Sequence, residues 1–317
     1  MQLSVLVTGA NGFVGSTVCK GARERGIHVR EAVRHAASAH AGVDVCLVSD
    51  LSADTQWSHA LQGVHVVVHC AARVHVMSDK AADPLADFRR INVDGTLNLA
   101  RQAAASGVRR FVFISSVKVN GEATAKGRAF SSGDQSQPQD PYGISKMEAE
   151  QGLHKVAADT GMQVVIIRPA LVYGPGVKAN FATLMGAVQR GLPLPLGAIH
   201  NQRSVLALDN LVDLIITCMT HAAAANQIFM ASDEQDVSTP ELVRHMALAL
   251  GKPARLVSVP VWLLKAIGYS TGRSKAVERL CGNLQVDLTK TRQVLGWRPK
   301  LTLDQGLQQV ARAMARK

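Results

Sequence analysis

The chain has 317 residues, enough for one large or two modest domains, and its 47% hydrophobic against 19% charged residues exclude extensive disorder. Of its formal net charge of +11, residues 252–317 carry +10 (13 basic minus 3 acidic side chains), which fits an anionic small substrate, an anionic membrane surface or a soluble exterior. Aromatic residues make up only 4%, so stacking platforms for single-stranded nucleic acid are scarce and we expect no nucleic-acid partner.

An apolar strand, Gln2–Val7, opens the chain and is followed by a glycine-rich loop and a helical stretch toward Arg25-Gly26. A side chain in such a loop would block the approach of a pyrophosphate, and the N-terminus of the next helix offers N–H donors to the anion. This order predicts a dinucleotide site, with an ordinary tight turn as the alternative. The residues expected to contact the cofactor here are Gly9, Asn11, Gly12, Phe13, Val14 and Gly15.

Further apolar strands follow, with helical stretches between them. This alternation predicts an α/β fold of the Rossmann type, a doubly wound parallel sheet in which ligands bind beyond the carboxyl ends of the strands. The strands are expected at 28–33, 43–48, 64–69, 111–114 and 164–167.

The residue at the end of the second strand indicates whether NAD or NADP is bound. An acidic side chain there accepts from the ribose of NAD, whereas an arginine suits the 2′-phosphate of NADP. This strand ends at Arg34, and Arg30 lies earlier on the same face, so we predict NADP in preference to NAD. The alternative is that Arg34 is an ordinary surface residue.

Small and polar residues follow the later strands. Asp50-Leu51 comes after the third strand, where Asp50 could accept from adenine or cap a helix. Ala71-Ala72 follows the fourth, where small residues let a cofactor pass close to the backbone or let a helix pack on the sheet.

The segment Tyr142-Gly143-Ile144-Ser145-Lys146 is the strongest chemical signal in the chain. Tyr142 and Lys146 are four residues apart at the start of a predicted helix, so they share one face, where an ammonium favours the phenolate of a proton carrier. Ser116, which follows the fifth strand, could hold a substrate oxygen beside that phenol. Their place after a strand of a dinucleotide fold makes the combination specific.

In these motifs the chain resembles the extended short-chain dehydrogenase/reductase family, in its branch of nucleotide-sugar epimerases, dehydratases and reductases. The resemblance covers nearly the whole chain. It is carried by Thr8-Gly9-x-x-Gly12-x-x-Gly15, Asp50-Leu51, His69-Cys70-Ala71-Ala72, Asn92-Val93-x-Gly95-Thr96, Ser115-Ser116, Tyr142-x-x-x-Lys146, Arg168-Pro169-x-x-Val172-Tyr173-Gly174-Pro175-Gly176, and Asp287-x-Thr289-Lys290-x-Arg292-x-x-Leu295-Gly296-Trp297-x-Pro299.

The resemblance implies roles for individual residues. Tyr142 would be the acid/base, Lys146 its electrostatic partner and a ribose ligand, and Ser116 the hydroxyl that positions the oxygen. Asn92 and Pro169 would lie at the cofactor, and Asn180, Arg203 and Arg279 around the diphosphate and uridine of a UDP-sugar. A surface role is the alternative for both arginines. We expect a cofactor domain at 1–178, with a returning segment near 204–235, and a mixed α/β substrate lobe at 179–317.

Two departures from the family pattern narrow the reaction. Dehydratases of this branch follow the catalytic hydroxyl with an acidic pair, but Ser116 is followed by Val117-Lys118, so elimination lacks its base and acid. Asn120-Gly121 replaces the usual Tyr-Gly, which puts fine substrate contacts in doubt.

We therefore expect an NADPH-dependent 4-ketoreductase that acts on a UDP-4-keto-6-deoxy-hexosamine for surface polysaccharide synthesis. A UDP-hexose or UDP-N-acetylhexosamine 4-epimerase is the first alternative. A non-catalytic NADP-binding sensor is the second, although such proteins typically lose the Tyr or the Lys. A reductase of the flavonoid type shares the placement of Arg34 and is a further rival.

The remaining expectations concern the setting of the protein. The five cysteines, odd in number and far apart, suit neither a disulfide framework nor a zinc site. No apolar run approaches the roughly 18 residues that span a bilayer, and the first residues lack a positively charged leader. We expect a reduced, cytoplasmic protein with no metal and no transmembrane segment. Helices expected at 84–106 and 141–160 would either form a homodimer interface or pack on the sheet.

Overall fold

The computed structural model describes residues 2–35, 43–74 and 83–315. Its centre is a seven-stranded parallel sheet in the order β3-β2-β1-β4-β5-β6-β9, which confirms the predicted doubly wound fold. The strand order reverses between β1 and β4, and such a reversal opens a ligand crevice at the carboxyl ends of the strands. The strands are β1 Ser4–Thr8, β2 His28–Val33, β3 Asp44–Leu47, β4 Val66–His69, β5 Arg110–Ile114, β6 Gln163–Pro169 and β9 Gln227–Ala231.

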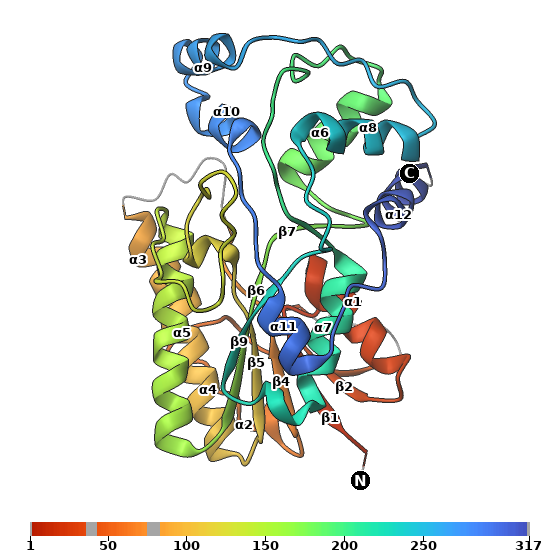
Figure 1. Ribbon diagram of the computed structural model, residues 1–317. Coiled ribbons are helices and arrows are strands. Elements are labelled where there is room, and N and C mark those ends of the chain that lie inside the picture. Colours follow the sequence, from red (N-terminus) through yellow and green to blue (C-terminus); the bar gives the residue numbers. More distant parts are fainter. Residues whose placement is uncertain (1, 36–42, 75–82, 316–317) are drawn as a thin grey trace.

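Helices cover both faces of this sheet (Figure 1). On one face, α2, α4 and α5 enclose a core that includes Leu99, Leu153 and Phe111, while α1, α7 and α11 enclose the core of the other face. Because both faces are covered, the middle residues of the central strands are apolar on both sides of the sheet. The bounds are α1 Phe13–Arg23, α2 Ser58–Leu61, α4 Thr96–Ala105, α5 Pro141–Thr160, α7 Leu208–Thr220 and α11 Thr289–Leu295.

The helix expected over 84–106 is divided. It consists of α3 (Pro84–Arg89), a π-helical segment (Arg90–Gly95) and α4. In the π-helical segment Gly95 lies against Leu51, where a Cβ would come within 2.8 Å of the Leu51 carbonyl carbon. The apolar faces of α4 and α5 pack on the sheet, which was one of the two expectations, and a homodimer stays a prediction.

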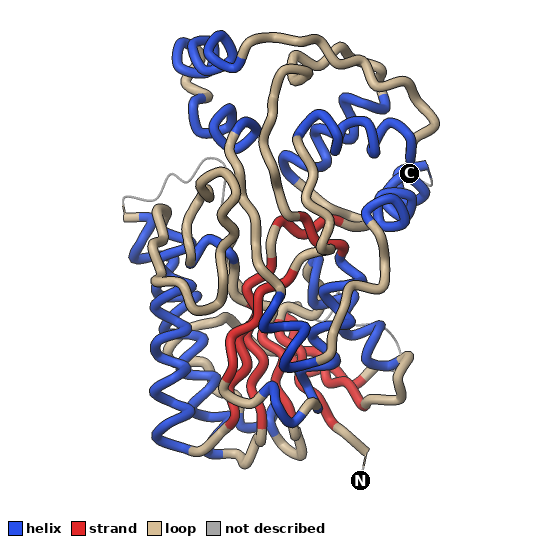
Figure 2. Tube along the Cα trace, viewed as in Figure 1, coloured by secondary structure: helices blue, strands red, loops and turns tan. Residues whose placement is uncertain are grey.

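A second lobe sits above the carboxyl ends of the strands (Figure 1). Figure 2 shows its only sheet among the described residues, the short parallel pair β7 (Leu171–Tyr173) and β8 (Val205–Ala207), at the junction of the lobes. Tyr173 stacks on Phe181 in the core of this lobe. Its helices are α6 Ala179–Gln189, α8 Thr239–Ala249, α9 Val261–Ser270, α10 Ser274–Cys281 and α12 Leu303–Ala315.

The chain returns to the first lobe twice. The segment expected near 204–235 forms β8, α7 and β9, and α7 packs against α1. A second return, absent from the sequence expectation, is α11, which packs on β9. Trp297, just after α11, is buried and donates to Asp213 at 3.0 Å, so it fills the core.

Candidate active site

The glycine-rich loop lies at the reversal of the strand order. Gly9 has a φ of +63°, and a Cβ on it would come within 2.9 Å of the Ala71 nitrogen, at the end of the neighbouring strand β4. A Cβ on Gly15 would lie 2.2 Å from the Gly9 oxygen. Helix α1 begins at Phe13, and no side chain caps its first N–H groups. The loop therefore has the shape of a cradle that a pyrophosphate fits and a side chain would fill.

The two arginines of β2 have different environments. Arg30 donates from Nε to Asp44 Oδ2 at 2.9 Å, and from Nη1 to the carbonyls of Ala60 and Gln62. It is therefore committed to the edge of the sheet and cannot support the phosphate as the sequence suggested. Arg34 is exposed just beyond the carboxyl end of β2. The nearest acidic side chain, Glu31, is buried and paired with Arg23.

The residues after β3 and β4 line the same edge of the sheet. Asp50 does not cap a helix, because its carboxylate lies 3.4 Å from Arg90 Nη1 in the π-helical segment. Leu51 is buried against that segment. Ala71 and Ala72 are partly exposed, and Ala71 contacts Gly9 across the crevice.

Asn92 has protein partners for its whole side-chain amide. Its Oδ1 accepts from the Arg73 N–H at 2.8 Å, and its Nδ2 donates to the Arg73 carbonyl and to Ser145 Oγ, both at 3.0 Å. The residue is 1% exposed. Asn92 thus links the loop after β4 to α5 by hydrogen bonds. The resemblance had implied that its side chain contacts the cofactor.

Tyr142 and Ser116 meet at the start of α5. Pro141 occupies the first turn, and the Asp140 carboxylate accepts from the Gly143 N–H at 2.7 Å, so the helix begins where the sequence predicted. Ser116 accepts from the Lys118 N–H at 3.2 Å, which fixes its hydroxyl at the end of β5. The Ser116 hydroxyl lies close enough to the Tyr142 phenol to act on its pKa.

Lys146 lies below this pair in a buried position, 2% exposed. Its Nζ donates to the Ile114 carbonyl at 2.8 Å and lies 4.3 Å from the centre of the Phe113 ring. Burial lowers the pKa of Lys146 to about 8. The Lys146 nitrogen is 6.0 Å from the centre of the Tyr142 ring, consistent with one shared helix face.

The pKa of Tyr142 moves in the direction opposite to the one expected. Burial raises the pKa of the phenol to about 12, the Asp140 carboxylate adds to the rise, and the nearby Ser116 hydroxyl acts against it. Desolvation is the largest of these effects. The chain's own residues therefore keep Tyr142 protonated near neutral pH.

A buried ionic network supports the site from below and was missed by sequence analysis. Arg168 on β6 pairs with Glu150 on α5, both side chains being 4% exposed. Glu150 also accepts from Ser115, and Arg168 donates from Nη1 to Asn120 Oδ1 at 3.1 Å. Asn120 is thus turned inward, away from a substrate. The signal for Glu150 was its position four residues after Lys146, on the same helix face.

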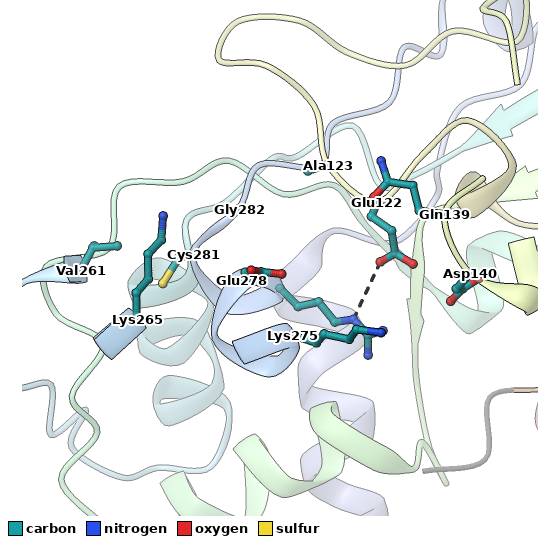
Figure 3. A pocket seen from close by; sticks show the side chains of 11 residues that line it. Glu122, Ala123, Gln139, Asp140, Val261, Lys265, Lys275, Glu278, Cys281 and Gly282 are labelled. Carbon is teal, nitrogen blue, oxygen red and sulfur yellow. Dashed lines mark ion pairs between the residues drawn. The ribbon is translucent and has the colours of Figure 1, made fainter. Parts of the chain in front are cut away.

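A pocket of about 430 Å³ lies between the loops that carry Glu122 and Asp140 and the α9–α10 hairpin of the second lobe (Figure 3). Asp140 and Glu122 stand on one side, and the α9–α10 hairpin contributes three cations and one carboxylate on the other: Lys265, Lys275, Arg279 and Glu278. Arg279 Nε lies 3.8 Å from a Glu122 oxygen, as the dashed line in Figure 3 shows. Since Asp140 is two residues before Tyr142, the pocket adjoins the candidate catalytic pair.

Lys118 neutralises the acidic side of this pocket. Its Nζ donates to Glu122 at 2.8 Å and also to Asp140. Both carboxylates near Ser116 are therefore paired.

The three expected substrate ligands are not brought together. Arg279 lines the pocket, whereas Arg203 and Asn180 do not. Arg203 donates from Nη1 to the carbonyls of Arg279 and Gly282 at 2.8 and 3.0 Å, so it supports the wall that carries Arg279. Asn180 is exposed at the start of α6. Pro169, at the end of β6, is buried.

Comparison with known proteins shows to which family the chain belongs. Residues 5–231 match the model of the NAD dependent epimerase/dehydratase family. The chain belongs to this family. This match confirms the resemblance to epimerases and dehydratases that the motifs carry.

Individual family members cover almost the whole chain. It is 51% identical to a UDP-glucose 4-epimerase from Vibrio cholerae, over 99% of this chain and 96% of that protein. It is 27% identical to an N-acetyl-alpha-D-glucosaminyl-diphospho-ditrans,octacis-undecaprenol 4-epimerase from Escherichia coli O157:H7, over 97% and 94% of the two chains. The structure of a UDP-glucose 4-epimerase from Thermotoga maritima, solved with UDP-glucose, superposes with a TM-score of 0.80 at 22% identity, covering 99% of both chains.

The five cysteines of this family member are free. Across residues 2–35, 43–74 and 83–315, no three His, Cys, Asp or Glu side chains gather as metal ligands would. In the same residues no helix is both long and apolar enough to cross a membrane.

Proposed function

We propose that the chain transfers hydride at C4 of a UDP-sugar with NADPH, as the 4-ketoreductase of a UDP-4-keto-6-deoxy-hexosamine. The observation that carries this proposal is the placement of Ser116, just after β5, close to Tyr142 in the first turn of α5, beside the pocket that holds Arg279. The reduced nicotinamide, when bound at the glycine-rich cradle, supplies the hydride.

The residues of the chain then have separate tasks. Ser116 orients the C4 oxygen, and Tyr142 donates its proton to that oxygen as negative charge develops there. Lys146 stabilises the phenolate that remains, because its ammonium faces the same side of α5. Arg279, Lys275 and Lys265 provide the positive charge that a sugar diphosphate requires.

Tyr142 is in the protonation state that ketone reduction requires. Burial raises the pKa of its phenol to about 12, so the neutral phenol can give its proton to the C4 oxygen.

The choice of NADPH rests on Arg34. It is exposed at the end of β2, and no acidic residue occurs between Arg34 and Val43 in the sequence. A 2′-phosphate would find a cation there, and a free ribose would find no carboxylate.

A UDP-hexose 4-epimerase is the second candidate. It is favoured by the 51% identity to the protein from Vibrio cholerae. Dehydration is disfavoured because Lys118 stands two residues after Ser116 and both nearby carboxylates are paired with it.

One set of assays separates these activities. The purified protein is given UDP-4-keto-6-deoxy-N-acetylhexosamine with NADPH, and the loss of near-ultraviolet absorbance is followed. We expect oxidation of NADPH. Interconversion of UDP-glucose and UDP-galactose by protein that retains NAD, without that oxidation, would instead establish the epimerase.

Tyr142→Phe tests the role of the phenol. Turnover should fall about a thousandfold, as for loss of a general acid, while affinity for NADPH is kept. Tyr269→Phe, at a tyrosine that is 84% exposed, is the matched control and should not change turnover. Unchanged turnover in Tyr142→Phe would refute the role of the phenol. A wild-type chain that binds NADPH but turns over neither sugar would point to the non-catalytic sensor. Weak binding of UDP would point to a reductase of the flavonoid type.

A further inference from the structure

The hairpin of α9 and α10 is the least buried part of the second lobe. Gly268 is the only buried residue of α9, and α10 has none. Four large apolar side chains of α9 face solvent: Trp262 is 69% exposed, Leu263 36%, Ile267 50% and Tyr269 84%. So many exposed apolar groups on one ten-residue helix indicate a surface that binds something.

The exposed apolar groups form one face of α9. The opposite face packs on α10, where Gly268 lies against Val277. At about 100° per residue, Tyr269, Trp262, Ala266, Leu263 and Ile267 fall within an arc of about 160° that points away from α10. The helix is therefore apolar around most of its circumference: Val261, Leu264 and Gly268 are turned inward, and this exposed apolar arc is turned outward.

Positive charge surrounds this face. The segment from Lys252 to Arg279 has six basic residues and one acidic residue, Glu278. Lys265 borders the apolar arc on α9 itself. The exposed basic residues of the segment are Lys252, Arg255, Lys265, Arg273 and Lys275. Apolar and aromatic side chains beside lysines and arginines are the composition of helices that lie in the surface of an anionic bilayer.

The hairpin also forms a wall of the candidate substrate pocket. Val261 and Lys265 of α9 and Lys275 and Arg279 of α10 line it (Figure 3). In Figure 1 the hairpin stands at the outer edge of the upper lobe. A sugar diphosphate with its sugar at Tyr142 and its diphosphate at these cations would have its remaining group beside α9.

We propose that α9 lies in the surface of an anionic membrane and that the pocket accepts a sugar joined through diphosphate to a membrane lipid. The substrate part rests on the proposed function, since it uses the same site and the same reaction at the sugar. At ten residues, about 15 Å, α9 is too short to span a bilayer and would lie along its surface.

A second copy of the chain is a less suitable occupant of this face. A two-fold symmetric contact through α9 places the same surface patch of both copies against each other, so residue i of one copy faces residue j of the other and the reverse. The cations at the border of the apolar arc would then face like charges, whereas anionic lipid headgroups would neutralise them.

Tryptophan fluorescence reports the docking directly. Of the three tryptophans, Trp57 and Trp297 are 1% and 5% exposed, so Trp262 alone should respond to vesicles. With vesicles of phosphatidylglycerol and phosphatidylethanolamine, we expect a blue shift of emission and co-flotation of the protein. Both should weaken with phosphatidylcholine vesicles or at high salt.

Ile267→Glu should reduce vesicle binding about tenfold or more, since it places a carboxylate in the apolar face. Leu248→Glu is the matched control, because Leu248 on α8 is 72% exposed but lies outside the hairpin, and it should leave binding unchanged. Equal loss in both variants, or no vesicle binding by the wild-type chain, would overturn the proposal. A blue shift that grows with protein concentration and without lipid would show that a second copy covers the face.

The substrate is tested separately. Vesicles that carry a polyprenyl-diphosphate-linked 4-keto-6-deoxy-N-acetylhexosamine are given to the protein with NADPH. We expect reduction that falls in Ile267→Glu in parallel with binding. Vesicle binding with turnover of the soluble UDP-sugar alone would refute the lipid-linked substrate. Vesicle binding with turnover of neither sugar would instead refute the proposed function. The two failures can be distinguished because vesicle binding is measured without any substrate.

Discussion

Replacement of Lys146 by Met should stabilise the fold while it removes the cation from the candidate site. The burial of Lys146 lowers its pKa from 10.5 to about 8, a shift of about 2.5 units. At 1.36 kcal/mol per unit, keeping this lysine inside costs about 3 kcal/mol at neutral pH. Loss of the hydrogen bond to the Ile114 carbonyl offsets about 1 kcal/mol of the gain. The free energy of unfolding should therefore rise by about 2 kcal/mol.

The gain should depend on pH with a definite sign. Between about pH 8 and pH 10.5 the lysine is largely neutral in the folded chain but protonated in the unfolded chain, so the unfolded state binds more protons and the wild type gains stability as pH rises. The advantage of Lys146→Met is thus fully present below about pH 8 and lost toward pH 10.5.

Urea denaturation at neutral pH and at about pH 10 measures both quantities. Lys155→Met, at an exposed lysine of the same helix, is the control and should change little at either pH. An equal gain at both pH values, or a loss of stability at neutral pH, would refute the reasoning.

Two further predictions concern other parts of the structure. Arg34→Gln should raise the KM for NADPH about tenfold and leave the KM for NADH unchanged, because one charge-assisted hydrogen bond is worth about 1.5–3 kcal/mol. Arg101→Gln, at an exposed arginine on α4, is the control. An equal change in KM for both cofactors would speak against a 2′-phosphate contact. Glu150→Gln should destabilise the fold by about 3 kcal/mol in urea denaturation, since it leaves Arg168 as a buried charge without its partner. Glu148→Gln removes the more exposed pair with Arg89 and should cost less than about 1 kcal/mol, so similar losses in the two variants would contradict this account.

Local signals made the framework predictable. Helix α5 spans Pro141–Thr160 as expected, because Asp140 caps it, Pro141 opens it and Gly161, with a φ of +75°, ends it. The strand β2 has the expected bounds, His28–Val33, because it follows the turn at Gly26, whose φ is +72°, and begins and ends near the β-branched residues Val29 and Val33.

Interactions between distant segments were not predictable in the same way. Arg30 was expected near the cofactor, but its partner Asp44 lies on the adjacent strand β3, and only the sheet order shows that they meet. Arg203 binds the carbonyl of Arg279, a pairing of two cationic residues that no sequence pattern indicates. The rise in the pKa of Tyr142 depends on burial, which the spacing of Tyr142 and Lys146 does not contain.

The tie between Arg203 and the carbonyls of Arg279 and Gly282 has a consequence for how this enzyme scaffold can diversify. Together with Asn201 Nδ2, which donates to the Gly282 carbonyl at 3.0 Å, it clamps the base of the α9–α10 hairpin to the loop before β8. Substitutions beyond the clamp can alter what the hairpin recognises without disturbing Ser116, Tyr142 or the sheet beneath them. The hairpin can therefore be exchanged as a unit. A chimera that receives residues 255–278 from a relative should bind the group beyond the diphosphate that this relative prefers.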